Sequence, residues 1–103
     1  MNIKESIRQI AENAQAASRV LSRKAATVKN DALLQMADEL IKNENFLLTE
    51  NKKDMAQAQK SGISGALLDR LTMKKSTIET MARDLREVAA LPDPVGKITA
   101  VWR

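Results

Sequence analysis

The chain has 103 residues, which is enough for one small domain. Hydrophobic residues make up 44% and charged residues 29%, a balance typical of a globular chain rather than a disordered one. The sequence contains no cysteine and no histidine, so it excludes disulfides, a thiol nucleophile, a histidine base and metal ligands of either type. Only Phe46 and Trp102 are aromatic, so any core must be built mainly from aliphatic side chains, methionine and alanine.

No membrane span or export signal is visible in the sequence. No apolar run approaches the ~20 residues that cross a bilayer. The first residues, Met1 to Glu5, lack the order of basic and then apolar residues that marks a secretion signal. We therefore expect a cytoplasmic protein with no membrane partner.

The net charge of +4 is concentrated at one end of the chain. Residues 1–30 contain six Lys/Arg and two Glu, whereas residues 31–103 contain eleven of each sign. The excess lies in a cluster of four cations, Arg19, Arg23, Lys24 and Lys29. Such a cluster can bind phosphate or nucleic acid. It is also typical of a solvated helix end, which is the preferred interpretation because no aromatic residue is nearby to stack on bases; we therefore expect no dedicated nucleic-acid site.

The first segment predicts a helix with a narrow apolar edge. Its apolar residues alternate in steps of four and three, which places them on one side of about five helical turns: Ile3, Ile7, Ile10, Ala14, Ala17 and Leu21. We call this edge the α-helical seam. It fits either a single helix packed on a larger body or half of a coiled coil, with the first interpretation preferred.

Three further helical segments are expected between residues 28 and 71. One begins after Thr27, whose hydroxyl can cap free N–H groups, and ends at Lys42-Asn43. The next contains Phe46 and is terminated by Gly62, which tolerates the left-handed conformation. Ser64 is then expected to cap a short helix over residues 66–71. The apolar stripes of these three segments are Leu33, Leu34, Ala37, Leu40 and Ile41; Phe46, Leu47, Leu48, Met55, Ala56 and Ala58; and Ala66, Leu67, Leu68 and Leu71.

Residues 74–90 carry the clearest helical pattern in the chain. Their apolar positions follow steps of three and four without a break: Ile78, Met81, Ala82, Leu85, Val88 and Ala89. Pro92 and Pro94 then stop the helix. Residues 95–102 are rich in strand-forming residues and predict one strand, which lacks a partner within the chain. The predicted organisation is thus a helical segment over 1–91, about five helices, followed by a Pro-rich turn and a first strand over 92–103.

Few residues are candidates for chemistry. Glu50 and Asp54 are four residues apart and can form a carboxylate pair, but Lys52 and Lys53 between them favour a solvated face. Ser64, in the run Gly62-Ile63-Ser64-Gly65, lacks the preceding strand and the histidine base that a serine nucleophile needs, so it is interpreted as a cap. The methionines after the first residue are interpreted as core filler: Met36, Met55, Met73 and Met81. No catalytic, cofactor-binding or metal-binding residue is assigned.

Several motifs resemble one enzyme family when taken in order. They are Lys29-Asn30 with Ala32-Leu33-Leu34 and Met36-Ala37-Asp38; Asn51-Lys52-Lys53-Asp54; Ala66-Leu67-Leu68-Asp69-Arg70-Leu71; Leu91-Pro92-Asp93-Pro94-Val95-Gly96; and Trp102. The most specific of these motifs is Leu91–Gly96, because it also lies at the expected distance after the Leu68–Leu71 run, Leu-Asp-Arg-Leu. Together they resemble gamma-glutamyl phosphate reductase, also called glutamate-5-semialdehyde dehydrogenase, of the aldehyde dehydrogenase superfamily. The sequence departs from the family at Gly65, where Glu is common, and at Met73-Lys74, where Thr-Pro or a similar pair is common; both positions are structural.

The resemblance implies an oxidoreductase of proline biosynthesis that reduces L-glutamyl 5-phosphate to L-glutamate 5-semialdehyde with NADPH. It also implies an α/β parent fold in which N-terminal helices pack on the cofactor domain and lead into the first strand of a sheet. The family's catalytic cysteine and cofactor site would lie beyond Arg103, so this chain by itself is expected to be inactive and to bind no cofactor.

Two functional interpretations therefore stand. The first is the N-terminal helical fragment of such a reductase, whose partner is the rest of the enzyme chain. The second is a stand-alone basic helical module that pairs through its helices or binds nucleic acid. The strand predicted at 95–102 favours the first, because a complete module would not end on an unpaired strand. In either case, exposed apolar helix faces predict a homo-oligomer.

Overall fold

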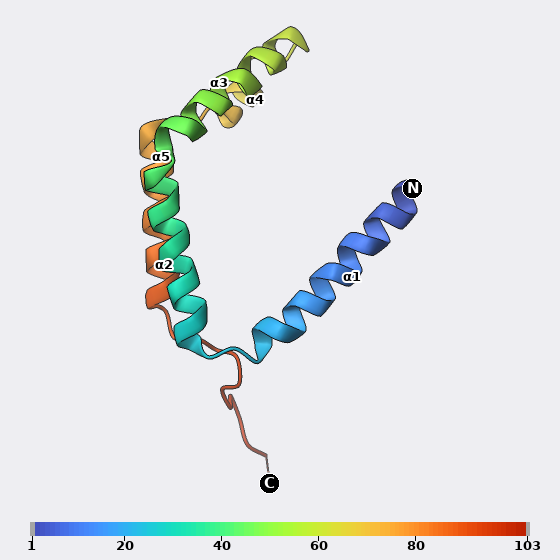
Figure 1. Ribbon diagram of the computed structural model, residues 1–103, viewed down its shortest axis with the longest axis vertical. Coiled ribbons are helices and arrows are strands. Elements are labelled where there is room, and N and C mark those ends of the chain that lie inside the picture. Colours follow the sequence, from blue (N-terminus) through green and yellow to red (C-terminus); the bar gives the residue numbers. More distant parts are fainter. Residues whose placement is uncertain (1, 103) are drawn as a thin grey trace.

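The computed structural model describes residues 2–102, which form a hook built of helices (Figure 1). The chain is 75% helical, as the sequence predicted. In the described part of the chain there are five helices: α1 (Ile3–Ser22), α2 (Ala26–Lys42), α3 (Glu44–Lys60), α4 (Ala66–Leu71) and α5 (Lys75–Ala90). The expected pattern at residues 74–90 is thereby confirmed as α5.

The centre of the fold is the pairing of α2 with α5, which run antiparallel side by side (Figure 1). Ala37 of α2 and Ile78 and Ala82 of α5 are completely buried. Alanine at a helix contact lets two backbones approach closely, so one large side chain, Ile78, is enough to fill the space between the helices. Arg86 Nη2 donates a hydrogen bond to Asp38 Oδ1 at 3.0 Å across the edge of this pair.

A single residue separates α2 from α3, so the two helices form a bent rod rather than a hairpin. Asn43 interrupts the helix with φ −99° and ψ 17°, and its side-chain amide donates to the Glu39 carbonyl at 2.8 Å. The Asn43 backbone amide also donates to the Glu39 carbonyl, at 3.0 Å, so Asn43 closes the end of α2 with two hydrogen bonds to one carbonyl. The predicted helix end at Lys42-Asn43 is therefore confirmed.

The chain reverses after α3 at Gly62, which has φ 86°. The amide of Ile63 donates to the Ala58 carbonyl at 3.0 Å, which closes the helix end as a glycine-terminated motif. The prediction that Gly62 terminates this helix is confirmed. The short helix α4 then lies against α3.

Asn51 on α3 fastens the connection between α4 and α5. Its side-chain amide donates to the Leu71 carbonyl at 2.9 Å, and its side-chain oxygen accepts from the Met73 amide at 2.8 Å. Asn51 is only 6% exposed, so both backbone groups depend on it in place of water. A polar residue of α3 thus sets where α5 begins.

Helix α1 projects away from the other helices. The side chain of Asn2 caps it by accepting from the Glu5 amide at 2.8 Å. None of the residues in α1 is buried. Figure 1 shows α1 leaving the start of α2 and diverging from the α2–α5 pair.

The open arrangement leaves an unusually large surface. The radius of gyration is 19.0 Å, against about 13 Å for a compact domain of this size. The accessible surface is 8699 Å², whereas a compact monomer of this mass exposes about 5,800 Å². The excess of about 2,900 Å² is comparable to a large protein interface.

Two predicted helix caps were wrong. Helix α2 begins at Ala26 with Ala25 as its cap residue, and Thr27 lies inside the first turn. The Ala25 carbonyl accepts from the amides of Val28 and Lys29, so the turn forms without a side-chain cap. Helix α4 is preceded by Gly65, not Ser64, because the chain enters α4 with φ 62°, a conformation that favours glycine.

The strand predicted over residues 95–102 does not form in the part of the chain that the structure describes. Instead the Lys97 amide donates to the Pro94 carbonyl at 3.1 Å and closes a turn. Beyond it, Ile98, Val101 and Trp102 are 81%, 74% and 91% exposed. A strand needs a neighbour to pair its backbone groups, and the helices offer none to this segment.

Removing the Asn51 side chain is expected to destabilise the fold. Asn51→Ala leaves the Leu71 carbonyl and the Met73 amide without partners in a covered position, so the free energy of unfolding should fall by about 2 kcal/mol. Urea unfolding followed by circular dichroism measures the change. Asn45→Ala, on the exposed surface of the same helix, is the matched control and should change the free energy by less than about 0.5 kcal/mol. Equal effects of the two substitutions would contradict the role of Asn51.

Candidate docking surface

The carboxylates singled out in the sequence form a solvated surface rather than a reactive pair. Glu50 Oε1 accepts from Lys53 Nζ at 2.9 Å, so its nearest charged partner is a lysine and not Asp54. The Glu50 side chain is 44% exposed. Among the described residues, no group of acidic side chains is arranged to hold a metal ion.

The basic cluster does not come together as one patch. Arg23 Nε turns back to the Arg19 carbonyl at 3.1 Å, where it helps to close the end of α1. Lys29 lies in the first turn of α2, after the connection from α1, and forms an ion pair with Asp93. Two of the four cations are therefore engaged within the chain, Arg23 at the end of α1 and Lys29 with Asp93.

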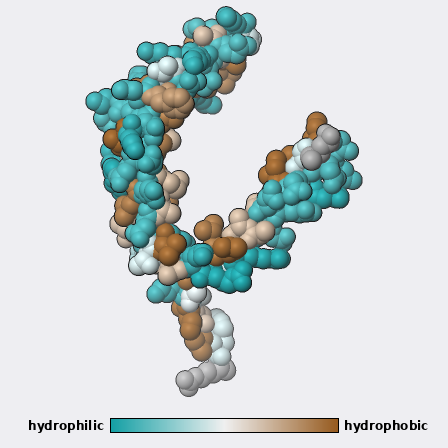
Figure 2. Space-filling view, in the orientation of Figure 1, coloured by the Kyte–Doolittle hydropathy of each residue, from teal (hydrophilic) through white to brown (hydrophobic). Residues whose placement is uncertain are grey.

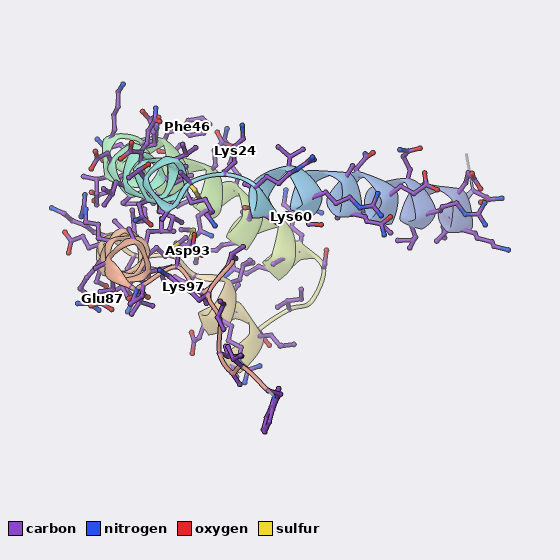
Figure 3. All side chains as sticks on the ribbon, turned by 90° about the horizontal axis from the view of Figure 1, so that it is seen from below. Lys24, Phe46, Lys60, Glu87, Asp93 and Lys97 are labelled. Atoms are coloured by element: carbon purple, nitrogen blue, oxygen red, sulfur yellow. The ribbon has the colours of Figure 1, made fainter. Side chains whose placement is uncertain are left out.

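Lys29 and Asp93 form a latch between the start of α2 and the segment after α5. Their side chains are 22% and 19% exposed, so both are mostly covered. Asp93 Oδ1 also accepts from the Val95 amide at 3.0 Å, which shapes the turn around Pro94. Figure 3 shows Asp93 at the base of the α2–α5 pair, with Lys97 nearby. The Lys29 ammonium first, and then the Val95 amide, lower the pKa of the Asp93 carboxyl from its ordinary value.

A groove of about 730 Å³ lies on the bend between α2 and α3 and is closed on the other side by α5. Its wall is apolar apart from Glu39, Asn43 and Asp84, and the other lining residues are Met36, Leu40, Phe46, Leu47, Met81, Leu85 and Val88. We call it the α2–α3–α5 groove. It offers an elongated apolar surface with two carboxylates and no cation among its lining residues.

Large side chains of this groove face solvent. Phe46 is 62% exposed, Met36 53% and Met81 41%. The interpretation of Met36 and Met81 as core filler was therefore wrong, because both stand on a surface. Flexible methionines around an aromatic ring adapt to varied apolar partners. The groove can therefore cover a row of apolar side chains from another segment.

A second apolar surface is the α-helical seam of α1. Ile3, Ile7 and Ile10 are 82%, 60% and 63% exposed, and Leu21 is 55% exposed. Figure 2 shows apolar side chains on α1, at the connection between α1 and α2, and on the C-terminal segment. These side chains lie on one side of α1, as the sequence predicted.

The three glycines stand at separate positions with positive φ: Gly62, Gly65 and Gly96. Gly65 precedes a helix of only six residues, too short for the glycine-rich loop and long helix that bind a pyrophosphate. None of the helices between residues 2 and 102 is long and apolar enough to cross a membrane.

Sequence reasoning missed the Asn51 contacts, the latch and the groove. Lys29 and Asp93 were each part of a recognised motif, but nothing in the sequence joined them across 63 intervening residues. The sequence did contain one signal for the groove. Phe46 is the only phenylalanine, and it lies at the start of a predicted helix, next to a predicted helix break.

Comparison with known proteins shows one consistent relationship, although no family model matches the sequence. Over all 103 residues the chain is 47% identical to a gamma-glutamyl phosphate reductase of Geotalea daltonii and 47% identical to one of Geobacter metallireducens. It is 44% identical to a protein of the same name from Clostridium kluyveri. Each match covers 100% of this chain and 25% of the relative, in its N-terminal segment. The chain thus spans about a quarter of the length of the curated relatives it matches.

The latch is expected to open at low pH. Because the folded pKa of Asp93 lies below its ordinary value of 3.8, ionised Asp93 stabilises the folded turn above that value. This stabilisation is lost as the pH falls through the lowered pKa. Hydrogen exchange at the Val95 amide, measured by NMR from neutral to strongly acidic pH, should lose protection in that window. Asp93→Asn should remove the pH dependence, and an unchanged profile in that variant would contradict the assignment.

Proposed function

We propose that this chain, homologous over its full length to the N-terminal segment of gamma-glutamyl phosphate reductases, is the helical N-terminal part of such an enzyme. The observation that carries the proposal is the identity of 43–47% across the whole chain to several proteins of that name. It confirms the resemblance found in the sequence motifs.

The proposed enzyme is an oxidoreductase of proline biosynthesis in the cytoplasm. In the proposed reaction, L-glutamyl 5-phosphate is reduced to L-glutamate 5-semialdehyde and phosphate is released; NADPH, held by other parts of the enzyme, would supply the hydride. This chain contains no cysteine and no glycine-rich loop, so the nucleophile and the cofactor site belong to other parts of the enzyme. Its own contribution is structural.

The structure suggests what that contribution is. The latch joins the Lys29-Asn30 motif to the Leu91–Gly96 motif, two segments that resemble the family and are distant in sequence. It holds residues 92–95 against the start of α2 and directs residues 95–102 away from the helices. Their exposed apolar residues suit a strand at the edge of a sheet supplied by the remaining three quarters of the enzyme, with an aldehyde-dehydrogenase-like α/β fold.

A chimera tests the proposal directly. Residues 1–103 replace the matching N-terminal segment of the Geotalea daltonii reductase, and the product is expressed in a bacterium that lacks its own reductase. We expect growth without proline and NADPH-dependent turnover by the purified chimera. The relative without its N-terminal segment is the negative control. A chimera that is folded and monodisperse but inactive would contradict the proposal.

The 103-residue chain alone should not oxidise NADPH in the presence of glutamyl phosphate. The reason is the absence of a cysteine to attack the acyl phosphate. Absorbance at the NADPH band measures the rate, with a mock purification as control. Turnover above that control would favour a different catalytic arrangement and would count against this proposal.

A further inference from the structure

The segment that follows α5 is covered at one residue, Asp93. Every other residue from Leu91 to Trp102 is exposed, whereas the Asp93 side chain is only 19% exposed. Its apolar neighbours Leu91 and Val95 are 62% and 52% exposed. Because the hydrophobic contribution scales with the apolar area removed from water, burial does little to hold this segment on the helices of this chain.

The polar contacts of the segment lead to the same residue. Two hydrogen bonds lie within the segment, donated by the amides of Val95 and Lys97. Between residues 2 and 102, the polar contact that joins residues 92–102 to the helices is a single ion pair, the latch of Lys29 and Asp93. One charged contact therefore fastens the whole segment to the helix pair.

The apolar packing beside the latch is incomplete. A space of about 210 Å³ lies next to Lys29 and Asp93, and its lining includes Leu33, Val88 and Pro92. Such a space has room for several water molecules, each of which occupies about 30 Å³ in the liquid. Side chains around it do not interlock closely enough to fix the segment, so the ion pair has this role.

Both ends of the latch stand on stiff backbone. Lys29 lies in the first turn of α2, where its amide donates to the Ala25 carbonyl at 3.3 Å. Asp93 lies between Pro92 and Pro94, whose rings fix φ at about −65° and restrict the residue before each ring to extended conformations. Because the backbone around Asp93 is restricted, holding its side chain also sets the direction of the residues that follow.

We propose that Lys29 and Asp93 are positioning residues: the latch sets the direction in which residues 95–102 leave the helices, and opening it releases this segment while α2 and α5 stay folded. The helix pair is closed by residues such as Ala37 and Ile78, which are completely buried without the latch. The consequence for an enzyme rests on the proposed function: the latch presents residues 95–102 to the rest of that enzyme in one direction.

Substitutions that remove one charge at a time test the latch in the 103-residue chain. Lys29→Met keeps an unbranched side chain, and Asp93→Asn keeps the oxygen that accepts from the Val95 amide. NMR relaxation gives the backbone order parameters of Val95 and Gly96, which should fall from about 0.85 to below about 0.6 in either variant. Both substitutions together should cause no larger fall, because each breaks the same contact.

Two control variants separate this contact from charge in general. Lys97→Met removes a lysine whose charge also lowers the pKa of Asp93, while the ion pair with Lys29 remains, so the order parameters should not change. Lys29→Arg keeps the positive charge and should keep the segment ordered. The order parameters of α2 and α5 should stay near about 0.85 in every variant, which separates release of the segment from unfolding.

The chimera with the Geotalea daltonii reductase tests the consequence for an enzyme. Lys29→Met should lower its turnover about tenfold or more, because misplacement far from the reacting atoms still costs rate. Lys29→Arg should retain the turnover of the unaltered chimera. An inactive unaltered chimera would contradict the proposed function alone, since the order parameters of the 103-residue chain test the latch without any activity.

Three results would overturn the inference. Unchanged order at Val95 and Gly96 in both single variants would show that the two prolines direct the segment without the latch. Loss of order in α2 and α5 together with the segment would show that the latch supports the fold instead of a direction. A Lys29→Met chimera as active as the unaltered chimera would contradict the positioning role.

Discussion

The structure depends on the close packing of α2 against α5. Ala37 and Ala82 allow the two backbones to approach, and Ile78 fills the space between them. The groove and the start of α5 are both placed relative to this pair. The bend at Asn43 and α5 enclose the groove, and Asn51 fixes where α5 begins. The core of this helix pair is also small: among the described residues, Ile78 is the one fully buried side chain larger than alanine.

A core of this size explains why so much apolar surface remains uncovered. A compact chain of similar length would fold its first helix back onto the others, whereas here α1 diverges and the C-terminal segment extends away from them. Burial of apolar surface contributes about 25 cal/mol per Å², so both segments gain free energy on meeting a partner. The two segments differ in kind, since α1 carries a row of apolar side chains on one helix, whereas residues 97–102 have no regular secondary structure.

The latch gives a physical meaning to the sequence motifs that identified the relatives. The lysine near the start of α2 and the aspartate between two prolines form one charged contact, and the Val95 amide completes it. Pro92 and Pro94 restrict the backbone around Asp93, which reduces the entropy lost when the turn orders. A Pro-Asp-Pro segment thus serves to direct the chain out of the helical part.

The sequence by itself determined the helical class, the positions of most helices and the family resemblance, because periodicity, proline and glycine act within a few residues. The helix ends at Asn43 and Gly62 followed from the same local rules. The caps at Thr27 and Ser64 were wrong, since the turns are set by Ala25 and by the left-handed Gly65. Only the tertiary structure decided that Met36 and Met81 line a surface, that Asn51 supports a distant connection and that Lys29 meets Asp93. It also decided that residues 95–102 form no strand on these helices. Such contacts join residues far apart in sequence, and a strand exists only where another backbone can pair with it.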